Sequence, residues 1–295
     1  MNFRKVNCSL FLGLATLFSM TFAAINADYC SRWDCCDNSC QQPQAQPCCD
    51  DCGFFAGVDV LIWTTYQSEL DYAVDGSGRP DGTNHFVDYD WDVGYRITAG
   101  YKLGCDGWDM RAVYTYFHNS GSDSASADDG KFLKASLFHP QTGDDDANDA
   151  KARVTLDYDV FDFVLSRPYF VSCTHIVRPF FGLRALWLNN KLKVTYEGRN
   201  FGTGSDAGRV NWKADWEGAG LYAGLEYNAH LNNCFTLYTN FAGSLLAGEN
   251  RSRLKHLDGD DTEVDAKEKQ CSGLPGYQIG SGFTYETKWC DYCFV

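Results

Sequence analysis

Strict alternation of apolar and polar residues is the feature that most constrains this chain. In the segment 91–103 (WDVGYRITAGYKL), the odd-numbered positions are all apolar or aromatic, and the even-numbered ones are polar or glycine. Successive side chains of a β-strand point to opposite faces, so this segment predicts a strand with one apolar face. Trp91 and Tyr101 lie about 33 Å apart at 3.3 Å per residue. A strand of that length, tilted by about 40°, crosses an apolar layer of about 25 Å.

Similar alternation recurs along the chain and predicts further strands. The additional segments are 53–63 (extending toward residue 74), 108–116, 152–165, 176–187, 218–227, 235–245 and 277–286. In 152–165 the pattern is less regular, because Asp162 falls on the face assigned as apolar. The predicted connections alternate between short ones at 104–107, 167–175 and 230–233 and long ones at 75–85, 119–151, 198–210 and 249–271.

This asymmetry separates two all-β folds. A soluble β-sandwich also alternates, but its loops have no reason to follow such a rule. Outer-membrane barrels combine short periplasmic turns with longer extracellular loops. We therefore predict an antiparallel, up-and-down transmembrane β-barrel of about eight strands over residues 53–288.

The N-terminus has the three parts of a secretory signal peptide. Arg4 and Lys5 precede a run from Leu10 to Ala24 that is almost wholly apolar or small, and Ala27 is the favoured cleavage site. The alternative is a retained anchor, but the run is short for a spanning helix of about 20 residues. Removal of residues 1–27 takes two basic residues and changes the net charge from −14 to −16. Such an acidic chain is not expected to bind nucleic acid.

The chain contains 14 cysteines, and most lie in places that a barrel would turn toward the periplasm. A Pro- and Gln-containing segment, 28–52, holds seven of them, and the tail 289–295 holds two. The disulfide candidates are Cys30, Cys35, Cys36, Cys40, Cys48, Cys49, Cys52, Cys105, Cys173, Cys234, Cys290 and Cys293. Only Cys271, at the base of the last predicted long loop, falls on the other side. After loss of Cys8 the count is odd, so intermolecular disulfides with other cysteine-rich envelope proteins are a hypothesis.

Metal binding and catalysis are both weaker interpretations. Cys49 and Cys52 have C-x-x-C spacing, but the segment has no histidine and structural zinc sites need more ligands. A calcium site at residues 258–262 would lack the ordered ligands of an EF-hand loop. The acidic residues of 119–150 and 258–265 are interpreted as solvated surface loops. His118 and Ser120 stand near the rim of a predicted strand, but no hydrolase or phosphate-binding motif is present. We expect no cofactor, no metal and no enzymatic activity.

Charges of both signs are expected on the inner face of the barrel. They are Asp92, Arg96, Lys102, Asp109, Arg111, Asp157, Asp159, Arg178, Arg184 and Glu226. These residues could form a salt-bridged plug or line a charged, water-filled path. About eight strands leave an interior that side chains nearly fill, whereas a wide aqueous channel needs about 16.

Several sequence blocks resemble the Legionella-type major outer-membrane protein family, which is pore-forming. The blocks are GVDVLIW at 57–63, DVGYRITAGY at 92–101, LDYDVFD at 156–162, RPFFGLRA at 178–185 and GLYAGL at 220–225. The cysteine content is similar to that of the disulfide-linked porins of chlamydia-like bacteria. The resemblance implies an outer-membrane barrel that contacts membrane lipid and forms a porin-like pore. The alternative is a non-conducting surface barrel that presents acidic loops to a binding partner.

Overall fold

The structure is a computed structural model that describes residues 13–25, 53–68, 70–76, 82–103, 107–128, 130–137, 146–172, 174–198, 207–231, 235–259, 261–285, 287–289 and 292–294. Its strands are β1 (Gly13–Ile25), β2 (Gly53–Tyr66), β3 (Asp71–Gly76), β4 (Asn84–Phe86), β5 (Asp92–Leu103), β6 (Trp108–Ser126), β7 (Phe132–Ala135), β8 (Asp146–Ala147), β9 (Asp149–Ser166), β10 (Tyr169–Phe170), β11 (His175–Glu197), β12 (Ala207–His230), β13 (Phe235–Asp258), β14 (Asp261–Tyr285), β15 (Thr287–Trp289) and β16 (Tyr292–Phe294). Within these ranges, no helix is long and apolar enough to cross a membrane.

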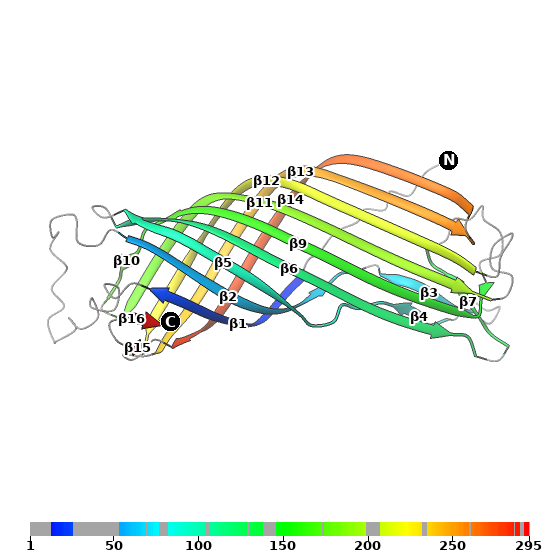
Figure 1. The fold of residues 1–295 in the computed structure, drawn as a ribbon, viewed down its shortest axis with the longest axis horizontal. Helices are drawn as coiled ribbons and strands as arrows, with labels where there is room; N and C mark the ends of the chain where they lie inside the picture. Colours follow the sequence, from blue (N-terminus) through cyan, green and yellow to red (C-terminus); the bar gives the residue numbers. More distant parts are fainter. Residues whose placement is uncertain are drawn as a thin grey trace.

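Two antiparallel sheets make up the described part of the chain. The main sheet has twelve strands in the order β14-β13-β12-β11-β9-β6-β5-β2-β1-β16-β15, with β10 paired to β11. The second sheet has the order β4-β3-β7-β8. The main sheet is strongly curved, and several of its strands run on together far past the curved part (Figure 1). The all-β, antiparallel prediction is confirmed.

The predicted number of strands is wrong. Each alternating segment coincides, to within one residue at its ends, with part of one of the long strands β2, β5, β6, β9, β11, β12, β13 and β14. However, the main sheet also contains β1 and three short strands, and the second sheet adds four more. The first predicted strand does not extend to Val74. The chain leaves the main sheet after Tyr66, and Asp71 already belongs to β3 of the second sheet.

The main sheet does not close into a barrel among the described strands. β14 and β15 stand at opposite ends of the strand order, and no pairing of β14 with β1 or β2 is described. The same two strands are separated along the chain by residue 286 alone. Because consecutive Cα atoms are about 3.8 Å apart, the sheet must curl round far enough to bring its two ends together there.

The predicted long loop 249–271 is almost entirely strand, which corrects the loop assignment. β13 runs to Asp258, β14 begins at Asp261, and these two residues are paired. The connection is therefore a tight hairpin, and Gly259 adopts the positive φ of 57° that such turns require. Of the predicted loop 198–210, only the last four residues are strand, because β11 ends at Glu197 and β12 starts at Ala207. The predicted loop 119–151 contains the end of β6, all of β7 and β8, and the start of β9.

The predicted signal peptide overlaps the first strand of the sheet. β1 pairs antiparallel with β2 from Gly13 opposite Tyr66 to Ala24 opposite Ala56. It also meets the short strand β16 at Ala24 and Ile25. This pairing does not test where the signal peptide, the cysteine-rich segment and the tail begin and end, so these boundaries remain predictions.

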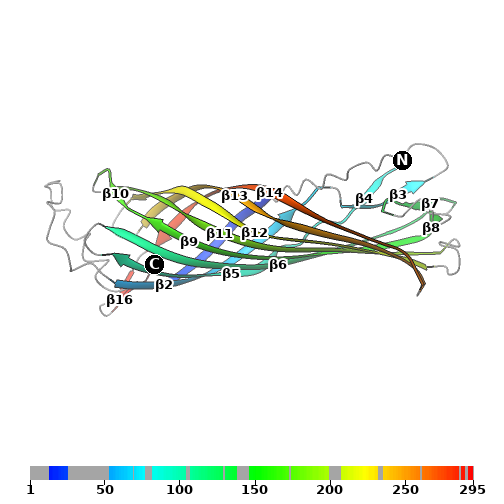
Figure 2. The same cartoon turned by 90° about the horizontal axis from the view of Figure 1, so that it is seen from above.

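The second sheet, which we call the cap sheet (β3, β4, β7 and β8), lies beside the far ends of the long strands in both views (Figures 1 and 2). Its buried Tyr72 and Leu133 belong to the same hydrophobic core as Val154 of β9 and Val194 of β11. The Tyr196 hydroxyl donates a 2.6 Å hydrogen bond to the carbonyl oxygen of Tyr72. The predicted loop 119–151, expected to be solvated, thus contributes β7 and β8 to a second layer that packs against the main sheet.

Candidate functional site: an apolar outer face and an ionic inner face

The main sheet has two chemically distinct faces. We call the face that carries Phe161 and Leu183 the outer face, and the face that carries Asp162 and Arg184 the inner face. The outer face exposes large apolar side chains, including Phe54 and Tyr277, each 79% exposed. Others on this face are Val58, Val60, Ile62, Val93, Tyr95, Ile97, Phe161, Phe163, Phe181, Leu183, Trp187, Leu221, Leu225, Phe241, Leu245, Ile279 and Phe283. A continuous apolar surface of this extent marks a contact with lipid or with another protein.

On β9, β11, β12, β13 and β14 the apolar outer face ends at one row of paired residues. Trp187 lies opposite Asp159 on one side and Glu217 on the other. Glu217 lies opposite Glu249, which lies opposite Cys271. The next outer-face row toward the apolar region is Phe161, Ala185, Ala219, Ala247 and Gly273. We call the first of these rows the boundary row.

The apolar part of β14 has the length expected of a membrane crossing. It runs from Gly273 to Tyr285, or about 40 Å along the strand at 3.3 Å per residue. With a tilt of about 40°, the height is about 30 Å, close to the apolar band of outer-membrane proteins.

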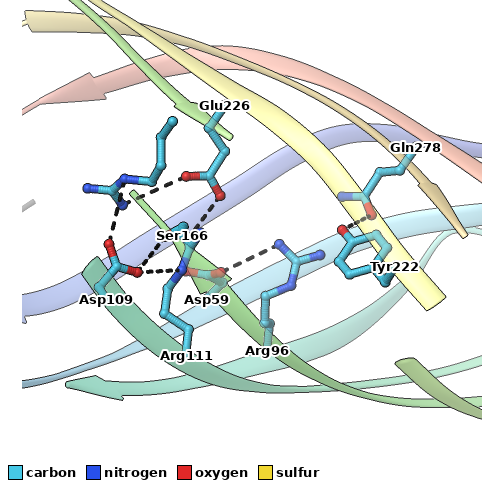
Figure 3. Close-up of polar contacts among 9 residues, drawn as sticks. Asp59, Arg96, Asp109, Arg111, Ser166, Tyr222, Glu226 and Gln278 are labelled. Carbon is cyan, nitrogen blue, oxygen red and sulfur yellow. Dashed lines mark hydrogen bonds and ion pairs between the residues drawn. The ribbon is translucent and has the colours of Figure 1, made fainter. Parts of the chain in front are cut away.

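The inner face holds a cluster of ion pairs (Figure 3). The Arg111 guanidinium lies 2.9 Å from the Glu226 carboxylate and 3.4 Å from that of Asp109. Arg178 lies within 3.9 Å of Asp109 and 3.8 Å of Glu226. The Ser166 hydroxyl donates a 2.5 Å hydrogen bond to Asp109.

Two further ion pairs extend this inner-face cluster. Arg96 of β5 lies 3.7 Å from Asp59 of β2. The Arg184 guanidinium donates two hydrogen bonds to Asp162, of 2.6 and 2.7 Å. The same guanidinium lies 3.7 Å from the ring centre of Tyr222. The Tyr222 hydroxyl donates a 3.3 Å hydrogen bond to Gln278, so this chain of contacts reaches β14.

The structure brings six of the predicted inner-face charges onto the inner face as one group. They are Arg96, Asp109, Arg111, Arg178, Arg184 and Glu226. Lys102 lies directly opposite Asp109 in the sheet. Asp92 lies at the start of β5 and accepts a hydrogen bond from the backbone N–H of Val93.

Two of the predicted inner-face charges lie on the other face. Asp159 accepts a hydrogen bond from Tyr114 and lies opposite Trp187. Asp157 lies 2.6 Å from the ring nitrogen of His118 and 3.9 Å from Lys191. Asp162, which the alternation had assigned to the apolar face, is instead the inner-face residue of β9. The assignment of β9 is therefore corrected by one position.

Sequence reasoning missed Asp59, Asp162, Ser166, Tyr222 and Gln278 as members of the inner-face group. Asp59 was the one charge in an apolar segment, and that isolation could have indicated a buried partner. Ser166 and Gln278 carry no such signal, since only the register of the strands places them beside Asp109 and Tyr222.

Most of the predicted disulfide candidates lie outside the described residues. The exception is Cys293, which falls in β16, opposite Ile25 and Lys288. Cys271 is an exposed free cysteine in the boundary row. Among the residues that the structure describes, no group of three His, Cys, Asp or Glu side chains could hold a metal ion.

The cap sheet covers the inner face beyond the boundary row. The core residues Val154, Leu156, Leu188 and Val194 have the same parity along β9 and β11 as Asp162 and Arg184, and the pairing of these strands has no bulge. A buried polar network fixes the segment that leads to the cap. The Tyr89 hydroxyl donates to Gln67 and Asn190, and the Asn190 amide donates a 2.5 Å bond to Gln67.

The sheet has an apolar outer face about 30 Å high and charges on its inner face. These features define the class of proteins that are embedded in a membrane through β-strands. Residues 46–290 match the family model described as Legionella pneumophila major outer membrane protein precursor. The chain belongs to this family, which confirms the resemblance seen in the sequence blocks. It is an outer-membrane protein, and the family is not one of enzymes. Searches of curated proteins and of solved structures gave no match.

Proposed function

We propose that this protein is an integral outer-membrane β-barrel with a porin-like path for small polar solutes. One observation carries the proposal: the same strands are apolar on their outer face and ionic on their inner face. A sheet with this pattern is stable in a bilayer only if it curls to hide its polar face and its unpaired edges from lipid. The family, an outer-membrane one, supports the location.

Strand direction and the predicted loss of the signal peptide support closure of the barrel. All neighbours in the main sheet are antiparallel, so β1 and β14 run in the same direction, whereas β2 and β14 run in opposite directions. Up-and-down membrane barrels are antiparallel throughout. We infer that cleavage after Ala27 removes β1 and lets β14 pair with the freed edge of β2. The mature protein then has a cysteine-rich periplasmic segment (28–52), a barrel (53–288) and a tail (289–295).

The solute path would pass the inner-face ion pairs. Arginines and carboxylates are interleaved there and bond to one another, so the lining is strongly charged but has little excess of either sign. Such a lining favours small hydrated solutes and disfavours apolar ones. Because side chains nearly fill a narrow barrel, we expect a small conductance.

Reconstitution into planar bilayers tests the proposal. The folded protein, extracted from envelopes, should migrate differently on gels before and after heating and should give uniform conductance steps. A heat-modifiable chain without conductance would reject the porin-like path but keep the barrel. A chain that is unaffected by heat would reject the barrel itself.

A second function, a non-conducting barrel that binds partners at the surface, is favoured by the cap sheet. The cap sheet packs over the inner face through the core that contains Tyr72, Leu133 and Val194, in the position where solutes would enter. If the cap stays closed, its surface and the hairpin tips become the functional part. Absence of conductance in the wild type, together with conductance after loosening of the cap, would support this second function.

The periplasmic cysteines are proposed to tie the barrel into the envelope. Each bridge would join two thiols and release two protons and two electrons to a disulfide-bearing oxidant of the periplasm. Their one-sided placement in the sequence supports this role. Unreduced gels of envelopes should show the chain in large complexes that reductant disperses. A chain that runs as a monomer without reductant would exclude the cross-links.

A further inference from the structure

Basic side chains gather on the outer face two rows beyond the boundary row. Lys191 lies opposite Lys213, Lys213 opposite Arg253, and Arg253 opposite Lys267, so four basic residues form one row across β11, β12, β13 and β14. The next row away from the boundary contains Arg153, Lys193 and Lys255. We call these seven residues the basic belt.

The like-charged cross-strand pairs of the first row need counter-charges. Like charges directly opposite one another on neighbouring strands are destabilising, and the first row contains three such pairs in succession. The chain as a whole has a net charge of −14, so a concentration of basic residues runs against its composition. Counter-charges for such a concentration come from acidic neighbours or from a ligand of opposite charge.

Acidic neighbours neutralise only part of the belt. Arg253 makes a bidentate ion pair with Asp265, and Lys267 lies 3.7 Å from the same carboxylate. Lys213 pairs with Asp215 at 2.6 Å, and Lys191 lies 3.9 Å from Asp157. The second row lies farther from the boundary, and in it Lys193 and Arg153 face outward and are exposed.

The position of the belt identifies the kind of ligand. The belt lies on the outer face, beyond its apolar part. In the proposed barrel it therefore faces the headgroup region of the surrounding lipids. Lys191 and Lys193 are four and six residues beyond Trp187, or about 10 and 15 Å above the band at 3.3 Å per residue and a tilt of about 40°. The polar headgroup layer of a phospholipid leaflet is only about 5–8 Å thick. Anionic groups at the height of the belt belong to larger headgroups.

We propose that the basic belt binds the phosphate groups on the sugar headgroup of an outer-leaflet glycolipid. The proposal rests on the proposed barrel and on its orientation, with the long strand ends outside the cell. Lys and Arg recognise phosphate through charge-assisted hydrogen bonds, and a belt across four or five strands contacts several phosphates at once. The glycolipid in turn relieves the repulsion between the like-charged cross-strand pairs.

Binding of a phosphorylated rough lipopolysaccharide to the folded, detergent-solubilised full chain tests this inference. The belt variant Lys193→Gln/Lys255→Gln is compared with the control variant Lys131→Gln/Lys134→Gln, which removes the same charge from the cap sheet and its approach. Each basic residue near an anionic lipid surface contributes enough to change affinity about fivefold. The belt variant should therefore bind at least tenfold more weakly, and the control should bind like the wild type.

Two further lipids identify the source of the phosphate. The same lipopolysaccharide after enzymatic dephosphorylation and an anionic phospholipid, phosphatidylglycerol, should both bind weakly and equally to the two variants. Equal affinity of belt and control variants for the phosphorylated glycolipid overturns the proposal. So does belt-dependent binding of phosphatidylglycerol at the same strength. Heat-modifiable migration and conductance of the same samples report on the barrel separately, and the belt variant should retain both.

Discussion

Arg111 and Glu226 form a 2.9 Å ion pair although their strands are not neighbours. β9 and β11 lie between β6 and β12 in the sheet. The two side chains therefore meet across the inner face of the curved sheet, on the proposed path (Figure 3).

Replacement of Glu226 should change ion selectivity. Glu226→Gln removes the carboxylate shared by Arg111 and Arg178, so the inner face gains a net positive charge. Rings of fixed charge set selectivity in narrow pores, and we expect the preference for anions over cations to rise by about twofold or more. Reversal potentials in a salt gradient measure this. Glu197→Gln, at the exposed end of β11, changes the same charge outside the path. An identical shift in both variants would contradict a path past Glu226.

The Arg184–Asp162 pair should be strongly coupled. Both side chains are nearly buried, and two hydrogen bonds join them. Asp162→Asn leaves the guanidinium without its counter-charge, which costs about 3–5 kcal/mol for a buried pair. The double replacement Asp162→Leu/Arg184→Met should recover most of that loss.

Unfolding in urea, followed by the folded band on unheated gels, measures these stabilities. The control pair is Lys151 and Glu197, which lie 3.9 Å apart and are exposed, so Glu197→Gln should change stability by less than about 0.5 kcal/mol. If the double variant is as unstable as Asp162→Asn, the pair is not coupled as described.

The long strands could be predicted because one face of each contacts an apolar environment. In β5, from Val93 to Leu103, apolar and polar residues alternate without exception, and periodicity alone defines the strand. Beyond the boundary row this signal disappears. In 261–271, charges such as Asp265 and Lys267 stand on the outer face, and the inner-face residues are mostly small or polar. The sequence therefore reads as a loop where the structure has β14.

Which residues lie on each face of the sheet could not be predicted without the register of the strands. Asp157, Asp159 and Asp162 all lie in β9, and alternation cannot decide which of them is inward when both parities contain an aspartate. The ion pair with Arg184 decides it. The basic belt has no sequence signature either, because Lys191, Lys213, Arg253 and Lys267 come from four strands and meet only through pairing.

Glycine is required at position 182, where the backbone of the neighbouring strand comes very close on the inner face. A Cβ added to Gly182 would lie 2.0 Å from the carbonyl oxygen of Phe163 on the neighbouring strand. Gly182→Ala must displace that strand and should cost about 1–3 kcal/mol. At Gly243 the nearest atom would lie 3.9 Å away, which is ordinary contact, so Gly243→Ala is the matched control. Urea midpoints that shift equally in both variants would contradict a special requirement for glycine at position 182.

The cap sheet should lose stability at alkaline pH through Tyr72. This side chain is buried in the core between the two sheets, and its hydroxyl donates a 2.9 Å hydrogen bond to Asp123. Burial, and then the bond to Asp123, raises the pKa of Tyr72 well above its usual value of 10. The folded cap therefore keeps the phenol protonated at a pH where an unfolded cap would release the proton. The stability due to this group is fully present below about pH 10 and is lost as the pH rises toward the raised pKa.

Protease cleavage of the cap, measured as a function of pH on the folded barrel, checks this prediction. Cleavage of the wild type should accelerate above about pH 10. Tyr72→Phe should be cleaved faster at neutral pH, because it lacks a hydrogen bond worth about 1 kcal/mol, but its cleavage should depend less steeply on alkaline pH. Tyr66→Phe replaces an exposed tyrosine at the end of β2 and should follow the wild type throughout. A Tyr72→Phe profile as steep as that of the wild type would show that another group controls opening of the cap.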